Sequence, residues 1–280
     1  MKKKCKCFLK CNAKATIWFA YYLVVQSLVC LGLFFVLLFD NDEFCERFID
    51  YYEPVSRISD YWKRQLACYD ALQGLLQGYS GVLIGLSSVI ILVILAVIWI
   101  IRKKQITWRI SVTHMTWCYV AGCFINLMLT AIVASLPECL VHTHDAATEF
   151  ALSDTFLLNL IAVGILGPIV EEIIFRYGIQ HNLYPVNITY AILYSGCIFG
   201  LLHGNQVQIV YATLLGWLFG YIYYRTGSLM YTIFLHIGIN SSSVIVNELF
   251  NNEVIGLMYM CIIVFLLKIL INRIRYIKIC

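Results

Sequence analysis

The chain has few charged residues for its length, and this scarcity excludes most soluble folds. Only 13% of its 280 residues are Asp, Glu, Lys or Arg, whereas 61% are hydrophobic. Soluble domains average about 25% charged and about 45–50% apolar residues. The composition therefore predicts an all-α polytopic membrane protein, folded as a single membrane domain over residues 1–280. The lipid bilayer is accordingly its first expected partner.

Signatures of several other protein classes are also missing from the sequence. It has no glycine-rich nucleotide-binding pattern and no interleaved basic and aromatic surface, so no nucleic-acid partner is expected. It has no HExxH zinc-protease pattern and no repeat with a period of 20 to 50 residues. The first apolar run is too long for a signal peptide, whose apolar region has about 7–15 residues. We therefore expect this run to be retained as a membrane helix.

Apolar segments recur along the whole chain. A spanning helix needs about 20 mostly apolar residues. About eight segments meet this requirement, so the two termini should lie on the same side of the membrane. The candidate spans cover residues 15–39, 80–101, 112–136, 155–177, 187–203, 207–224, 229–248 and 254–272.

The charged residues are distributed asymmetrically about these spans. Basic residues gather in segment 1–14, after the second span and at the C-terminus, which all lie on one side in this topology. The positive-inside rule makes that side the cytoplasm, so 1–14 is predicted to be a basic cytosolic tail. Acidic residues gather in segment 40–79, which we expect to be an external loop with a short amphipathic helix. The short chain without a targeting extension predicts a multi-pass protein of the plasma (cell) membrane.

The fourth span contains charged residues inside an apolar segment. Glu171, Glu172 and Arg176 are ionisable groups, which cost roughly 2.5 kcal/mol or more at mid-bilayer and are functional candidates by default. Glu172 and Arg176 are four residues apart, so on a helix they share a face and can pair. Glu171 points about 100° away and has no partner in this segment. Pro168 precedes them and should free a backbone carbonyl and bend the helix.

Polar residues of two later spans could complete a site with Glu171. His203 ends the fifth span, and His236 and Asn240 lie four residues apart on one face of the seventh. Taken singly, each would more often be a hydrogen-bonding residue between helices, and the Glu–Arg pair a structural ion pair. Their combination in three apolar segments favours a shared intramembrane site.

Glycines spaced four residues apart accompany these polar residues. Gly200 and Gly204 flank His203, and Gly216 and Gly220 lie in the sixth span. Such small-xxx-small pairs let membrane helices approach closely, so we expect both pairs to lie at helix contacts.

Three motifs in the second half of the chain resemble those of a known family. They are, in chain order, Glu171-Glu172-x-x-x-Arg176, Phe199-x-x-x-His203 and His236-x-x-x-Asn240. Their order on separate apolar segments is similar to that of the CPBP family (CAAX protease and bacteriocin-processing, also called Abi). The resemblance covers about residues 155–245, the expected catalytic core. It implies an eight-helix intramembrane endopeptidase that hydrolyses a peptide bond of a peptide or membrane-protein substrate.

The resemblance also implies a role for each motif residue. These roles are activation of the attacking water by Glu171 and His203, stabilisation of the oxyanion by His236 and Asn240, and organisation of the site by Arg176 with Glu172. The implied mechanism uses no metal. Peptide hydrolysis needs a base for water, donors for the oxyanion and a proton for the leaving amine, and these residue types can supply all three.

Other interpretations of the same residues stay open. A catalytic zinc site needs three protein ligands plus water, and Glu171, His203 and His236 could supply them. We expect no cofactor, with zinc as the alternative. The same fold could also serve as a non-proteolytic bacteriocin self-immunity protein or a membrane scaffold. A proton-coupled transporter is disfavoured because the segments show no inverted repeat.

Overall fold

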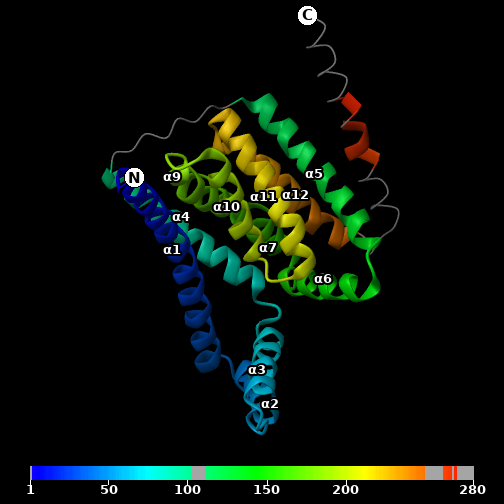
Figure 1. The fold of residues 1–280 in the computed structure, drawn as a ribbon. Helices are drawn as coiled ribbons and strands as arrows, with labels where there is room; N and C mark the ends of the chain where they lie inside the picture. The colour runs from blue at the N-terminus through cyan, green and yellow to red at the C-terminus, as the bar shows by residue number, and fades with distance from the viewer. Residues whose placement is uncertain (1, 103–110, 250–260, 267, 270–280) are drawn as a thin grey trace, which may run out of the picture.

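The fold is known from a computed structural model that describes residues 2–102, 111–249, 261–266 and 268–269. Every regular element in these ranges is a helix and none is a strand, which confirms the predicted all-α class (Figure 1). Six helical segments of the described chain are long and apolar enough to cross a membrane, and Ile188–Leu201 is a shorter apolar helix. The chain is therefore a multi-pass membrane protein. The predicted eighth span, 254–272, lies mostly outside the described residues.

Two long helices and two short ones make up the N-terminal part. Helix α1 (Lys2–Asp40) continues through the segment predicted as a basic tail, so that segment is helical from its second residue. The predicted loop 40–79 instead contains two helices, α2 (Asp42–Ser56) and α3 (Tyr61–Leu76), which project from the bundle (Figure 1). Side chains at the N-caps start both helices by accepting backbone N–H bonds. Helix α4 (Ser80–Arg102) then returns along α1.

The C-terminal part contains the helices that carry the motifs. The chain passes through α5 (Val112–Ala134) and then α6 (Glu138–Ala151), a short helix in a region that the sequence analysis left as a loop. The fourth span is a segmented helix made of α7 (Phe156–Ile161), η1 (Ala162–Leu166), α8 (Gly167–Glu172), η2 (Ile173–Gln180) and α9 (His181–Leu183). Three helices follow, α10 (Ile188–Leu201), α11 (Gln206–Thr226) and α12 (Leu229–Leu249).

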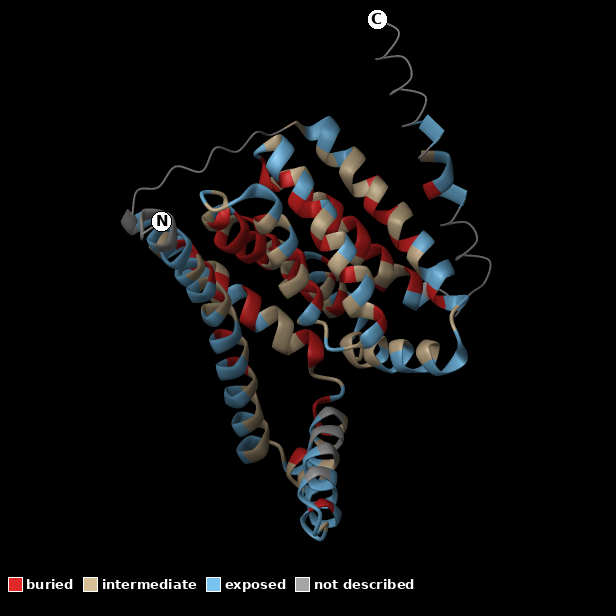
Figure 2. Cartoon of the chain, viewed as in Figure 1, coloured by how far each residue is buried: buried red, intermediate tan, exposed pale blue. Residues whose placement is uncertain are grey.

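Buried residues concentrate in the segmented helix and α12 (Figure 2). In the most apolar stretch of each span, 50% of residues are buried for 156–183 and 61% for α12, but only 11% for α1. Helix α12 packs against α5, η1 and α8, and α10 packs against α11 and η2. The motif-bearing helices therefore form the centre of the bundle.

Glycines make the closest helix crossings. A Cβ atom at Gly122 of α5 would overlap the carbonyl oxygen of Leu235, and one at Gly238 of α12 would overlap that of Tyr119. Helices α5 and α12 can approach this closely only because both residues lack a side chain. Helices α5 and α12 are thus held in close contact at this crossing.

The predicted glycine pairs are only partly helix contacts. Gly200 lies against Thr213 of α11, and a Cβ at Gly216 would lie 2.8 Å from the Cα of Gly196, so these positions do let α10 and α11 approach. The prediction for Gly204 is wrong. Gly204 lies in the turn after α10 with a φ of +70°, and nothing lies within 4 Å of a Cβ built on it. Its backbone conformation, which disfavours other residues, explains the glycine there.

Candidate active site

The helix that carries the glutamates changes its hydrogen-bond register on both sides of them. The Gly167 N–H donates to the carbonyl of Ala162, five residues back, which is the π-helical pattern of η1. The His181 N–H donates to Arg176, again five residues back, and closes η2. Glu171 and Glu172 thus lie in the short α-helical segment between two π-helical ones. Such π-helical segments are rare in proteins overall, and those that occur are often found at functional sites.

Glu172 and Arg176 form the ion pair that their spacing predicts. Both side chains are fully buried, and Arg176 Nε donates to Glu172 Oε2 at 3.1 Å. Arg176 Nη1 also donates to Ser195 Oγ of α10 at 3.1 Å, and that hydroxyl donates to the Phe175 carbonyl at 2.9 Å. Arg176 therefore joins the segmented helix to α10 as well as neutralising Glu172.

His236 of α12 connects the two glutamates. Its Nδ1 lies 3.2 Å from Glu172 Oε1, and its Nε2 lies 3.7 Å from Glu171 Oε2. A carboxylate can only accept a hydrogen bond, so Nδ1 is the donor. The Glu171 side chain is 23% exposed, whereas that of Glu172 is not exposed at all. Glu171 is therefore the carboxylate that a substrate or a water molecule can reach.

Two phenylalanines enclose this polar chain. The guanidinium carbon of Arg176 lies 5.4 Å from the ring centroid of Phe199 and 5.7 Å from that of Phe219. The His236 ring lies 5.6 Å and 5.1 Å from the same two rings. The rings keep water from the ion pair and add cation–π attraction to Arg176. Phe199 belongs to a predicted motif, whereas Phe219 gave no signal because an aromatic residue in an apolar span is ordinary.

His203 and Asn240 lie on the flanks of the cluster. His203 Nδ1 donates to the Phe199 carbonyl at 3.0 Å, and its ring packs edge-on against Phe199 at 5.1 Å. Asn240 Nδ2 donates to the Val163 carbonyl in η1 at 3.2 Å. Within the described part of the chain, no hydrogen bond or ion pair joins His203 to Glu171. The structure thus brings Glu171, Glu172, Arg176 and His236 into direct contact, and it places His203 and Asn240 beside them.

Helix α1 contributes a residue that the sequence analysis did not single out. Tyr22 interacts electrostatically with Glu171. Its ring packs edge-on against Phe175 with centroids 6.1 Å apart. From the sequence alone, a tyrosine in the first apolar span is interpreted as a residue at the membrane interface. Its position near Glu171 follows only from the packing of α1 on η2.

The alternative zinc site would use Glu171, His203 and His236. Among the residues that the structure describes, no three His, Cys, Asp or Glu side chains are grouped to hold a metal ion. Of the proposed ligands, His236 donates from Nδ1 to Glu172, and His203 donates from Nδ1 to a backbone carbonyl. Both rings keep Nε2, and metal-binding histidines commonly donate their other N–H in this way, so these two bonds are compatible with either mechanism.

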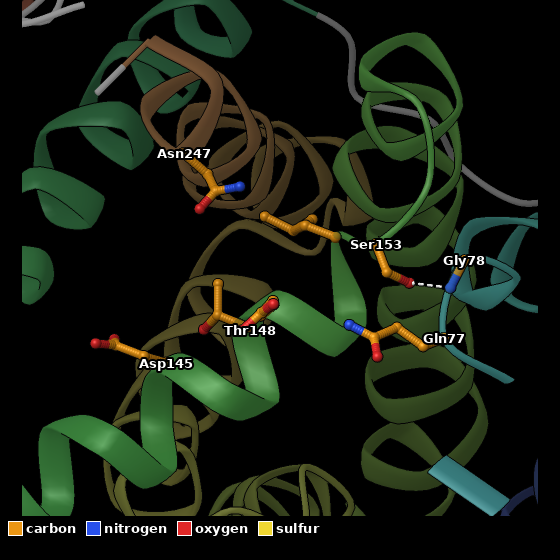
Figure 3. A pocket seen from close by; sticks show the side chains of 8 residues that line it. Gln77, Gly78, Asp145, Thr148, Ser153 and Asn247 are labelled. Carbon is orange, nitrogen blue, oxygen red and sulfur yellow. Dashed lines mark hydrogen bonds between the residues drawn. The ribbon is translucent and has the colours of Figure 1, made fainter. Parts of the chain in front are cut away.

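A cavity of about 590 Å³ lies apart from the cluster, between the α3–α4 turn, α6 and the end of α12 (Figure 3). Its wall is polar, and the Gly78 N–H donates to Ser153 Oγ across it at 2.8 Å. It contains none of the motif residues. The lining residues are Gln77, Gly78, Asp145, Thr148, Glu149, Leu152, Ser153 and Asn247.

Comparisons with known proteins agree with the motifs. Residues 153–242 match the family described as type II CAAX prenyl endopeptidase, Rce1-like. The chain is also 34% identical over 131 residues to a Bacillus subtilis (strain 168) protein named "Putative membrane peptidase YdiL". This alignment covers 45% of the chain and 54% of that protein, so the chain spans about half the length of the curated relative. No solved structure matches. All three motifs lie inside the matched range, so this part of the chain is similar to the CPBP family.

Proposed function

We propose that this chain is an intramembrane endopeptidase of the CAAX-protease type, which hydrolyses a peptide bond with water activated by Glu171 and His203. The observation that carries the proposal is the chain of contacts from Arg176 through Glu172 and His236 to Glu171. A structural ion pair needs only its two members. Here a histidine extends the pair to a second carboxylate that is partly exposed. The Rce1-like match and the membrane-peptidase relative support the same class.

Glu171 is the group proposed to take the first proton. As the water oxygen bonds to the carbonyl carbon of the peptide, one water proton moves to the Glu171 carboxylate. The carbonyl oxygen becomes an oxyanion in the tetrahedral intermediate. When the C–N bond breaks, the carbonyl re-forms and the leaving nitrogen takes the proton from Glu171. The carboxylate is thereby regenerated, and one water is consumed for each bond cleaved.

His203 is proposed to orient the attacking water beside Glu171. Its Nδ1–H donates to the Phe199 carbonyl, so the neutral ring carries its lone pair on Nε2. That nitrogen can accept a hydrogen bond from the water. The backbone bond fixes both the tautomer and the direction of the ring, which is the arrangement a positioning base needs.

His236 and Asn240 are proposed to stabilise the oxyanion. Because His236 Nδ1 donates to Glu172, the ring can donate from Nε2 only as the imidazolium, whose charge Glu172 would balance. Asn240 commits one amide hydrogen to Val163 and keeps the other for the substrate. Losing one preorganised donor of this kind typically lowers kcat by about 10²–10³-fold.

The proposed substrate is a peptide or a segment of a membrane protein, and no cofactor is proposed. The site residues lie on helices of the apolar bundle, so the scissile bond must be reached within the membrane domain. The mechanism needs only water, two carboxylates, two imidazoles and an amide.

The test is cleavage of a peptide library, including prenylated CAAX peptides, by the purified protein in detergent. We expect Glu171→Gln and His203→Ala to abolish cleavage while the protein still folds, and a strong zinc chelator to leave cleavage unchanged. Glu138→Gln, which alters an exposed glutamate at the start of α6, is the matched control and should cleave normally.

Three results would contradict the proposal. Normal cleavage by Glu171→Gln would remove Glu171 from the reaction. Cleavage that the chelator stops and zinc restores would make the histidines metal ligands. Failure of the folded wild type to cleave any peptide would favour a non-proteolytic role for the same site.

A further inference from the structure

The Val163 carbonyl has lost both of its helical donors. In the α-helical register it would accept from the Gly167 N–H, but that group donates to Ala162 instead. In the π-helical register it would accept from residue 168, which is proline and has no N–H. The bilayer interior offers no water to take the place of a missing donor. The carbonyl must therefore find its partner on another helix.

Asn240 of α12 supplies that partner. Its Nδ2 donates to the Val163 oxygen at 3.2 Å. Helix α12 comes close enough because the next residue is Gly164, where a Cβ would lie 3.3 Å from the Cα of Ser241. The bond also fixes the direction of the amide, because a carbonyl can accept from the NH₂ group but not from Oδ1.

We propose that Pro168 is a positioning residue that acts on the reaction through Asn240. Pro168 withdraws the N–H that would otherwise occupy the Val163 carbonyl, and the vacant carbonyl holds the Asn240 amide beside the segment that carries Glu171. One amide hydrogen is used as the anchor, and the other is left to meet the oxyanion. The inference rests on the proposed peptidase function, because it says how one donor of that site is held.

The alternative, that Pro168 only kinks the helix, predicts a different result for the double variant. A proline that only bent the helix would contribute independently of any residue on α12. Pro168 and Asn240 instead act on one carbonyl, so their effects must be coupled. A double-mutant cycle measures this coupling directly.

The first readout is thermal unfolding of the purified full chain in detergent, which requires no activity. Asn240→Ala leaves the Val163 carbonyl without a partner and should lower Tm by on the order of 4 °C. In the Pro168→Ala background the chain regains an N–H at position 168 that can take the carbonyl. Asn240→Ala should then lower Tm by less than about 1 °C. If Asn240→Ala does not fold, Asn240→Leu keeps the volume of the side chain and removes its donors.

Asn126 provides a matched control. It also donates from Nδ2 to α12, to Ser242 Oγ at 3.2 Å, and it shares no partner with Pro168. Asn126→Ala should therefore lower Tm equally in both backgrounds. Coupling seen with Asn240 but not with Asn126 would assign the effect to the Val163 carbonyl.

The second readout is the kinetics of peptide cleavage. Pro168→Ala should lower kcat by about 10-fold and leave KM unchanged, because the amide loses its anchor while substrate binding is intact. In the Asn240→Ala background Pro168→Ala should lower kcat no further. Rate losses that multiply would overturn the proposal.

The two proposals can fail separately. Equal Tm losses for Asn240→Ala in both backgrounds, from a protein that cleaves normally, would overturn the Pro168–Asn240 link alone. A wild type that cleaves no peptide would overturn the proposed function. The double-mutant cycle measured by Tm would still show whether Pro168 and Asn240 are coupled.

Discussion

Arg176 is a fully buried cation, and the residues around it either neutralise or enclose it. Its Nε donates to Glu172, and its Nη1 donates to Ser195. Phe199 and Phe219 cover the guanidinium group with centroids 5.4 and 5.7 Å from its carbon. Removing an ion from water costs several kcal/mol, so the buried pair is viable only while each of these partners is in place.

Replacement of Arg176 should therefore lower the free energy of unfolding more than any surface substitution does. We expect Arg176→Ala to lower the free energy of unfolding by about 3–5 kcal/mol, because Glu172 stays buried without its cation. Arg176→Lys should recover little, because an ammonium group lacks the planar fork that reaches Glu172 and Ser195 together. The measurement is unfolding of the purified chain in detergent. Arg225→Ala, at an exposed arginine in the last turn of α11, should stay within about 0.5 kcal/mol of wild type. Full recovery by lysine would contradict the argument.

Spacing along the chain predicts partners on one helix but not across helices. The four-residue intervals correctly placed Glu172 with Arg176, because a helix turn fixes that geometry. They could not show that His236 would bridge the two glutamates, or that the partner of Asn240 would be a backbone carbonyl. Both contacts depend on which helices are neighbours. The sequence pattern does not contain that information.

Among the helices, the crossing of α5 with α12 sets the position of His236. Gly122 and Gly238 lie where the backbones of α5 and α12 meet, and a Cβ at either position would overlap the backbone of the other helix. Gly238 is two residues after His236 on the same helix. Any change that moves α12 away from α5 must therefore move the imidazole relative to the glutamates on α8.

A methyl group at this crossing should damage both stability and activity. Gly122→Ala places a Cβ against the Leu235 carbonyl, and we expect overpacking to cost about 1–3 kcal/mol of unfolding free energy. Cleavage should fall with it, because His236 is displaced. The control is Gly32→Ala in α1, where nothing lies within 4 Å of the new Cβ and a better helix former is introduced. Unfolding and cleavage are measured for both variants. If Gly122→Ala and Gly32→Ala had the same unfolding free energy and the same cleavage rate, the close crossing of α5 and α12 would be disproved.

The extent of the elements was harder to predict than their existence. The fourth span was predicted to cover residues 155–177, but the helix continues to Leu183. The buried Glu172–Arg176 ion pair therefore lies inside the helix rather than at its end. The register changes at η1 and η2 were not predicted beyond the bend at Pro168, because they depend on tertiary partners such as Asn240.

Across the whole molecule, basic residues gather at one end of the bundle and acidic residues gather at the other. The starts of α1 and α5, together with α9, lie at one end of the bundle, and α2, α3 and α6 lie at the other (Figure 1). Segment 1–14 at the first end is basic, whereas segment 40–79 at the other is rich in acidic residues. The positive-inside rule then predicts that the first end faces the cytoplasm.

Cysteine labelling in intact cells can test this orientation. Cys7 is exposed in α1, Cys68 is exposed in α3 and Cys139 is exposed in α6. In variants that keep one cysteine each, a membrane-impermeant maleimide should label Cys68 and Cys139 directly. It should label Cys7 only after the membrane is permeabilised.

The same experiment locates the site along the membrane normal. The Asn205 amide, two residues after His203, donates to the Thr143 carbonyl of α6 at 2.7 Å. This bond ties the His203 end of α10 to the helix that carries Cys139. External labelling of Cys139 would therefore place His203 toward the outer side, and a hydrophilic peptide would have its shortest route to His203 from there. Labelling of Cys7 in intact cells, with Cys139 protected, would invert the molecule and give that route to cytoplasmic peptides.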